Sequence, residues 1–147
     1  MEFRNLSIDE LIAKPEFPAL ADEYAWESGN RDLGEHDIDF DHYRPLEEAG
    51  LLVIVGAFCG EALVGFATLL LDVHHHYSKV VAVVDTVFLT GSKRKGPAGL
   101  HLLRKVFEAA RAAGAEGAYL SAPAGSRLER LLSLRFEKTD SVFWKKL

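Results

Sequence analysis

Residues 80–99 read VVAVVDTVFLTGSKRKGPAG, and this stretch decides the fold. Its first half is a nearly uninterrupted run of β-branched and apolar residues, which is typical of a strand covered on both faces and placed centrally in a sheet. Its second half is rich in small residues and leads into an amphipathic helix. The apolar residues of that helix recur at helical spacing: Leu100, Leu103, Phe107 and Ala110. The sequence therefore predicts a buried strand, a glycine-rich turn and a helix in direct succession.

The flanking sequence predicts the rest of a mixed sheet. Ser7 and Glu10 have the S-x-x-E spacing of a capping box, which predicts that a helix begins there. The other expected elements are a strand at 2–6, helical segments from Pro18 and at 40–49, hairpin strands at 51–58 and 62–71, a strand at 117–121, a helix at 126–134 and a closing strand at 136–147. We expect one domain over 1–147, with an α/β (α+β) fold whose mixed, mostly antiparallel sheet is flanked by helices.

The composition is that of an ordinary globular protein. Of the 147 residues, 48% are hydrophobic and 27% are charged, which excludes disordered, collagen-like and low-complexity classes. The one cysteine, Cys59, cannot form an internal disulfide. The chain shows no apolar leader and no run of the roughly 20 apolar residues that a membrane helix needs. We therefore expect a cytoplasmic protein with no membrane partner.

The charges are divided unevenly along the chain. Residues 1–50 hold 14 acidic and 4 basic residues, whereas residues 51–147 hold 8 acidic and 13 basic residues, so charges of −10 and +5 combine to the net −5. Opposite charges attract a ligand to a surface, so the second half favours a phosphate-bearing ligand and the first half a cationic amine. Two solvated faces would give the same division, and both interpretations stay open here.

The turn between the strand and the helix has the features of an anion site. Unpaired amides and the helix dipole favour an anion at a helix start, and the basic residues 93–95 add positive charge. A phosphorylated cofactor is the expected ligand; the alternative is a basic turn whose glycines only reverse the chain. Gly91 and Gly96 are spaced as in a P-loop, but Pro97 and Ala98 replace its Lys and Ser/Thr. The dinucleotide fingerprint G-x-G-x-x-G does not fit either.

Residues 93–98, Lys-Arg-Lys-Gly-Pro-Ala, resemble the pyrophosphate loop [QR]-x-x-G-x-[GA] of the GNAT superfamily of N-acetyltransferases, with Lys in the first place. The expected element order resembles that family over nearly the whole chain. Residues 74–99 are also similar to acetyltransferase-like proteins of tailed bacteriophages. The resemblance implies acetyl-CoA as co-substrate, with its pantetheine arm along the strand and its pyrophosphate on the loop. The implied cofactor-binding residues are Val87, Phe88, Leu89, Lys93, Arg94, Lys95, Gly96, Pro97, Ala98 and Gly99.

Asp85 is the candidate catalytic base, because it is a carboxylate within an apolar strand where we expect it to be buried. The alternative is a strand-end carboxylate held by a Lys, an Arg or a backbone donor. Members of the family often carry in the last helix a Tyr that protonates the leaving thiolate. Here that place falls on Leu131, so Tyr119 or water would donate the proton.

The resemblance implies an N-acetyltransferase that acts on a primary amine of a small molecule or protein. The alternative is a non-catalytic acyl-CoA-binding or interaction protein with a GNAT fold. Both functions predict that the loop at 93–98 binds the cofactor, and only the first predicts acetyl transfer.

His74, His76 and Tyr77 are the candidates for binding the acceptor, and one His could serve as an alternative base. With Asp72 the two imidazoles could ligate a metal if the strand continued, but exposed or acceptor-facing histidines are the stronger interpretation and no metal is expected. The acidic net charge and the lack of interleaved aromatic residues argue against nucleic-acid binding at residues 93–95. The expected partner is an amine acceptor, cationic if the acidic half lines the site, and the sequence is compatible with a homodimer.

Overall fold

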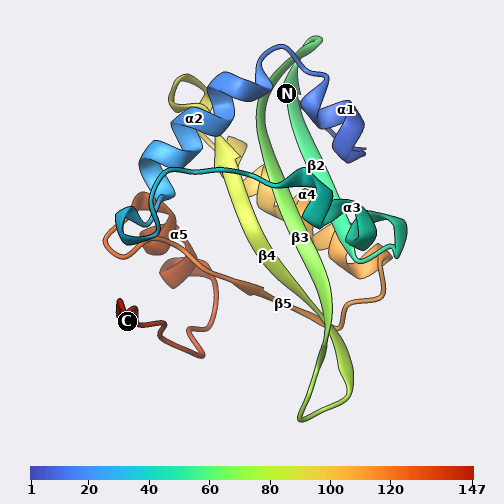
Figure 1. Ribbon diagram of the computed structural model, residues 1–147, viewed down its shortest axis with the longest axis vertical. Coiled ribbons are helices and arrows are strands. Elements are labelled where there is room, and N and C mark those ends of the chain that lie inside the picture. The colour runs from blue at the N-terminus through green and yellow to red at the C-terminus, as the bar shows by residue number, and fades with distance from the viewer.

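The computed structural model describes residues 1–147 and contains one five-stranded sheet in the order β1-β2-β3-β4-β5 (Figure 1). Neighbouring strands are antiparallel from β1 to β4, and β5 is parallel to β4. The strands are β1 (Glu2–Leu6), β2 (Leu52–Cys59), β3 (Ala62–His74), β4 (Lys79–Leu89) and β5 (Gly117–Leu120). The helices are α1 (Ile8–Ile12), α2 (Phe17–Ser28), α3 (Phe40–Glu48), α4 (Ala98–Ala112) and α5 (Arg127–Arg135), with 3-10 turns η1 (Arg31–Leu33) and η2 (Gly91–Lys93). The mixed, mostly antiparallel sheet that the sequence predicts is confirmed.

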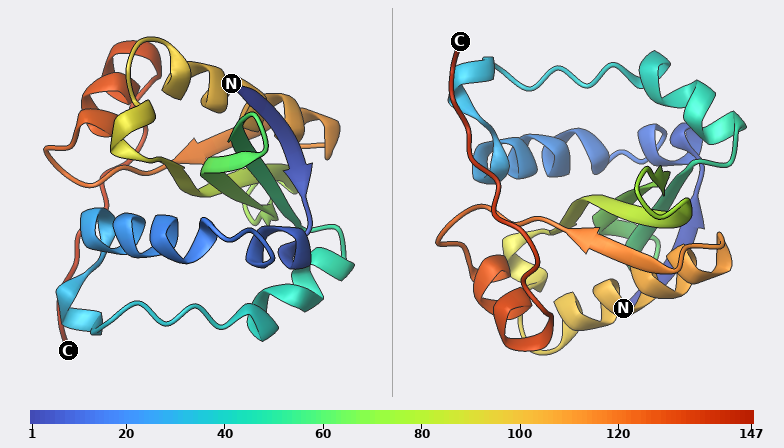
Figure 2. Two further views of the ribbon diagram at one scale, coloured as in Figure 1. Left: turned by 90° about the horizontal axis from the view of Figure 1, so that it is seen from above. Right: turned by 90° about the horizontal axis from the view of Figure 1, so that it is seen from below.

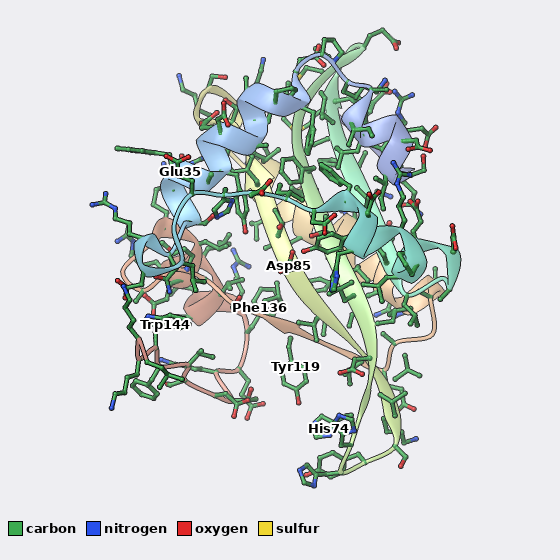
Figure 3. The ribbon with its side chains drawn as sticks, viewed as in Figure 1. Glu35, His74, Asp85, Tyr119, Phe136 and Trp144 are labelled. Carbon is green, nitrogen blue, oxygen red and sulfur yellow. The ribbon has the colours of Figure 1, made fainter.

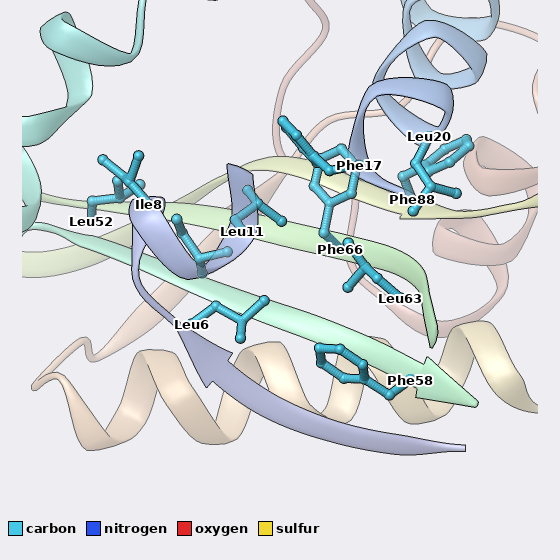
Figure 4. Packing of buried hydrophobic residues seen from close by; sticks show 11 residues of the cluster. Leu6, Ile8, Leu11, Phe17, Leu20, Leu52, Phe58, Leu63, Phe66 and Phe88 are labelled. Atoms are coloured by element: carbon cyan, nitrogen blue, oxygen red, sulfur yellow. The ribbon is translucent and has the colours of Figure 1, made fainter. Parts of the chain in front are cut away.

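The helices cover the two faces of the sheet unequally. Figure 2 shows α1, α2 and α3 on one face, here called the front, and α4 and α5 on the other, the back. On the front, Phe17 packs edge-on against Phe66 with ring centroids 5.5 Å apart, beside Leu20 and Phe88 (Figure 4). On the back, Leu102 and other apolar residues of α4 pack against alternate residues of β2, β3 and β4. Alternation along each strand thus gives the sheet two apolar faces.

Local signals set several of the element boundaries. The Ser7 hydroxyl accepts from the Glu10 amide (3.1 Å) and the Glu10 carboxylate accepts from the Ser7 amide (2.8 Å), so the predicted capping box starts α1. Gly50 follows α3 with a φ of +71°, and Gly60 turns the β2–β3 hairpin with a φ of +60°. No helix in the structure is long and apolar enough to span a lipid bilayer.

The predicted closing strand at 136–147 is wrong. Phe136 ends α5 in an extended conformation, but the segment after it pairs with no strand. Its apolar side chains stay in solvent, with Val142 and Phe143 each 90% exposed. Residue type alone favours extension there, but a strand forms only where its backbone finds a hydrogen-bonded neighbour. The segment instead passes from the back to the front, where the Trp144 indole donates to Asp32 (3.0 Å) (Figure 2).

Candidate functional site

The edge of β4 opens where β5 ends. The parallel pairing joins Val81–Val84 of β4 to Gly117–Leu120 of β5 and stops there, although β4 continues to Leu89. Thr90 donates its amide to Val64 on the β3 side, and bonding in an antiparallel pair alternates between residues. The backbone groups of Val87 and Leu89 therefore face the open side. These residues belong to the segment along which the resemblance implies a pantetheine arm.

The turn that follows β4 presents a set of unbonded amides. The first main-chain bond of α4 runs from the His101 amide to the Pro97 carbonyl (2.9 Å). The preceding amides donate to no other group of the protein: those of Lys95, Gly96, Ala98, Gly99 and Leu100. Pro97 occupies the N-cap position and offers no side-chain cap. Amides exposed at the start of a 15-residue helix form an anion site.

Two glycines give this turn its shape. Gly96 has a φ of +65°, which other residues rarely adopt, so it bends the chain just before the helix. A Cβ added at Gly96 or Gly99 would meet no atom within 4 Å, so the space above the amides is open. The glycine-rich turn and the helix start are confirmed as the sequence predicts them.

Arg94 is engaged within the protein. Its guanidinium forms ion pairs with Glu27 (2.8 Å) and Glu23 (3.6 Å) of α2 and donates to the carbonyl of Leu89. It also lies over the Phe88 ring, 5.1 Å from the centroid. Lys93 and Lys95 are exposed and form no ion pair. The two lysines are therefore the available positive charges beside the open amides, while Arg94 joins α2 to the end of β4.

Sequence reasoning missed Glu23. Its carboxylate accepts from the Gly91 amide (2.8 Å) and from the Thr90 hydroxyl (2.7 Å). The bond from Gly91 is the main cause that holds the pKa of Glu23 below its ordinary value, with further help from Thr90 and Arg94 against the opposing effect of burial. Because 67 or more residues separate Glu23 from these partners, no local spacing pattern could have pointed to the contact.

Asp85 lies at an irregularity in β4. Thr68 pairs with Thr86 but the next rung joins Leu69 to Val84, so Asp85 is the extra residue of a β-bulge. The Thr68 hydroxyl donates to the Asp85 carboxylate (3.3 Å), and the Thr86 hydroxyl lies 3.4 Å from it. The side chain is exposed on the front face, so the predicted burial is wrong: the bulge turns it out of the apolar strand (Figure 3).

Two tyrosines from the front helices border Asp85, and sequence reasoning named neither. The hydroxyl of Tyr24 in α2 lies 3.4 Å from that of Thr86, and its ring packs on Phe88. Tyr43 in α3 has its pKa raised, first by burial and then by the charge of Asp85 and the proximity of Tyr24. Asp85 therefore sits in the gap between α2 and α3, with hydroxyl groups around its carboxylate.

The remaining predicted residues lie farther down the front face. Tyr119 on β5 is 42% exposed and pairs with Val83, two residues before Asp85. The His74 ring is 6.3 Å from that of Tyr119 and 4.8 Å from that of Tyr77. His76 joins the same aromatic group, 5.9 Å from His74. Figure 3 shows Asp85, Tyr119 and His74 in descending order along one face.

These residues do not assemble a metal centre. The structure contains no group of three or more His, Cys, Asp or Glu side chains arranged to hold an ion. Leu131, at the place where the family often has a tyrosine, lies within α5. The arrangement joins an anion site, an open strand edge and a carboxylate on the front face.

The structure is similar to those of several acetyltransferases. An aminoglycoside acetyltransferase from an uncultured soil metagenomic sample matches with a TM-score of 0.74 at 16% identity, over 99% of this chain and 95% of that one. A ribosomal-protein-alanine N-acetyltransferase from Brucella melitensis biovar Abortus 2308 matches with a TM-score of 0.73 at 16% identity, over 100% and 99%. AAC(6')-Iy, solved with the bisubstrate analogue CoA-S-monomethyl-acetylneamine, matches with a TM-score of 0.72 at 16% identity, over 99% and 97%.

No family model and no curated protein matches the sequence. At the identities of the solved structures, the likeness shows the fold. The chain therefore has the fold of the GNAT N-acetyltransferases, as the element order and the loop at 93–98 predict.

Proposed function

We propose that this protein is an N-acetyltransferase that moves the acetyl group of acetyl-CoA to a primary amine. One observation carries the proposal: the amides at the start of α4 are unbonded and lie beside the stretch of β4 whose edge has no strand partner. A diphosphate on those amides would let a pantetheine arm lie along that edge. A helix start alone would accept any anion, and the adjoining open strand edge favours a long, extended ligand such as acetyl-CoA.

The residues present fit this co-substrate. Open space above Gly96 and Gly99 admits a phosphate close to the backbone, and Lys93 and Lys95 are free to neutralise it. The backbone groups of Val87 on the open side can bond the pantetheine arm in the manner of an added strand. Acetyl-CoA supplies a thioester, whose carbonyl the exposed β4 amides can polarise.

Asp85 is the proposed base. Its carboxylate lies on the front face at the bulge, where an amine can approach between α2 and α3, and takes the proton that the ammonium must lose. The neutral nitrogen then forms a bond to the acetyl carbon and releases its second proton as the bond from carbon to sulfur breaks. Tyr119 or water is the proposed source of the proton for the thiolate, because α5 carries Leu131 where a tyrosine acid would be expected.

The acceptor is proposed to be a cationic amine. Asp85 has no basic partner, since the ion pairs of the structure involve other carboxylates. The neighbouring groups that contact it are hydroxyls. An ammonium would supply the missing positive charge, which favours it over a neutral or anionic acceptor.

Release of free CoA in the presence of a panel of amines tests this function. We expect turnover with at least one primary amine, and Asp85→Asn should reduce kcat/KM by about 100-fold or more while leaving acetyl-CoA binding unchanged. Acetyl-CoA binding without release above background for any amine would instead support a non-catalytic acyl-CoA-binding protein. Unchanged turnover in Asp85→Asn would remove Asp85 from the mechanism.

A further inference from the structure

Below Asp85 the front of the sheet carries a shallow cavity that no helix covers. Its volume is about 180 Å³, and Asp72, His74, Val81, Val83 and Tyr119 contribute to its lining. Strand pairing places these side chains in rows across the sheet, and each row, here called a rung, consists of residues paired on neighbouring strands. Leu70, Val83 and Tyr119 form one rung across β3, β4 and β5, and Asp72 and Val81 belong to the rung two residues farther on.

The floor of this cavity is apolar although it faces solvent. Val83 is 39% exposed and Tyr119 is 42% exposed, on a face whose upper part is sealed by α1 and α2. A ligand on this strip can cover apolar side chains. It can form no hydrogen bond to the backbone between the strands, because β3, β4 and β5 are already paired there. A ligand that rests on it gains by covering apolar side chains.

A carboxylate stands at each end of the apolar strip. Asp85 marks the upper end and Asp72 the lower end. Asp72 pairs with Val81, which is four residues from Asp85 along β4, so the two side chains start about 13 Å apart at about 3.3 Å per residue. Neither carboxylate has a basic partner: the nearby Lys79 is bound to Glu116 (3.0 Å).

The lower end offers further groups for a cation. Asp72 accepts from the Val73 amide (2.7 Å) through one oxygen, which leaves the other oxygen available. His74 Nδ1 is buried without a hydrogen-bond partner in the protein, an orphan acceptor or donor at the wall of the cavity. The Tyr119 ring, 6.3 Å from that of His74, borders the same space.

We propose that the acceptor is a linear aliphatic diamine, with one amine at Asp85 and the other at Asp72. This inference rests on the proposed function and names the substrate class of the same site. The methylene chain lies over Leu70 and Val83, and Tyr119 flanks it. An ion pair brings each nitrogen within about 4 Å of its carboxylate, so nitrogens about 5 to 13 Å apart fit. An extended chain of about six to eight methylene groups places its nitrogens about 9 to 11 Å apart, well within that range.

The acetyl transfer balances with this acceptor. The ammonium at Asp85 loses one proton to that carboxylate and becomes the neutral nucleophile. Its nitrogen loses a second proton as the amide bond forms and the bond from carbon to sulfur breaks, and the leaving CoA thiolate takes up one proton in exchange. The amine at Asp72 stays charged throughout. Asp72 is therefore a residue that determines specificity, and it takes no part in the bond that forms.

Steady-state kinetics with matched amines test the assignment. We expect kcat/KM for 1,8-diaminooctane to exceed that for octylamine by about two- to fivefold, since one partly exposed ion pair distinguishes them. Asp72→Asn should raise KM for the diamine by about two- to fivefold, leave its kcat unchanged and leave octylamine unaffected. Glu61→Gln, at the exposed β2–β3 turn, removes one negative charge elsewhere and should change neither amine.

Equal use of the two amines, or a preference for the diamine that survives in Asp72→Asn, would overturn the inference while leaving the acetyltransferase in place. Calorimetric binding of the diamine gives a readout that needs no turnover. Diamine binding that Asp72→Asn weakens, in a protein that acetylates no amine, would support the site and reject the proposed enzyme. Failure of the diamine to bind at millimolar concentration would overturn the site itself.

Discussion

The charge of Asp85 acts on Tyr43, and the titration of Tyr43 measures this effect. The charge of Asp85 contributes to the raised pKa of Tyr43, after burial as the larger cause. Replacing Asp85 with Asn removes this charge and should shift the titration of Tyr43 to lower pH, toward the ordinary value, without restoring it fully. In a ¹³C-labelled protein, the NMR chemical shift of a Tyr43 ring carbon, followed against pH, reports this titration. A titration that does not move in Asp85→Asn would show that the two groups do not interact.

Glu23 makes stability depend on pH. Because its folded-state pKa is lowered, the carboxylate stabilises the fold above its unfolded pKa, and this stabilisation is lost as pH falls through the folded value. Glu23→Gln should lower the free energy of unfolding at pH 7 by about 1 kcal/mol, a modest figure because the side chain is about one-third exposed.

Urea unfolding of wild type and Glu23→Gln at pH 7 and at lower pH checks this. The difference between the two proteins should shrink as the pH falls below the ordinary range of a glutamate. Asp22→Asn, the adjacent acid on the same helix, is the matched control and should show a smaller effect. A difference that stays constant with pH would mean that the charge of Glu23 has no role at the Gly91 amide.

At the level of single residues, the sequence singled out a residue at the candidate site but did not predict its surroundings. Asp85 stood out because it interrupts an apolar run, and it does lie beside the open edge of β4. Its exposure depends on a bulge between Thr68 and Leu69, which residue types do not encode. Glu23 and Glu27 could not be found from spacing, because their partners lie on a loop distant in sequence.

Among the strands, the contact of β3 with β4 depends on the absence of a side chain at Gly65. A Cβ there would lie 2.3 Å from the carbonyl oxygen of Phe88 and 2.9 Å from the Cα of Leu89, so backbone would have to move. Gly65→Ala should lower the free energy of unfolding by about 2 kcal/mol or more and displace the open edge of β4.

Gly117→Ala is the matched control, because a Cβ at this other strand glycine meets nothing within 4 Å. Chemical denaturation of both variants measures the difference, and acetyl-CoA binding by Gly65→Ala shows whether the edge has moved. Equal stability of the two variants would contradict the close approach of β3 and β4.

At the level of elements, strong local signals predicted well. The capping box at Ser7, the run at 80–89 and the glycines that follow helices each fix a boundary through interactions within a few residues. The closing strand failed for the opposite reason, since a strand needs a distant partner and the segment 136–147 has none. Likewise, the sequence order predicted that β4 and β5 exist but not that their pairing ends at Val84.

The molecule as a whole places three features together: open amides on the loop before α4, an unpaired edge on β4 and a carboxylate on the front face. Each comes from a different element, and the sheet and α2 hold them in place. The ion pairs of Arg94 with Glu23 and Glu27 join the loop to α2, so the loop before α4 and the front helix α2 are parts of one connected structure.

The most direct test of this account is acetyl-CoA binding by Gly99→Glu, followed as a shift in melting temperature. Acetyl-CoA at 100 times its dissociation constant should raise the free energy of unfolding of the wild-type protein by about 2.7 kcal/mol. Its melting temperature should then rise by several degrees. Gly99→Glu puts negative charge among the open amides, in a position where a Cβ meets nothing, and should abolish the shift while the protein stays folded. Ala112→Glu, at the other end of α4, should retain the shift; a full shift in Gly99→Glu as well would contradict a diphosphate at this helix start.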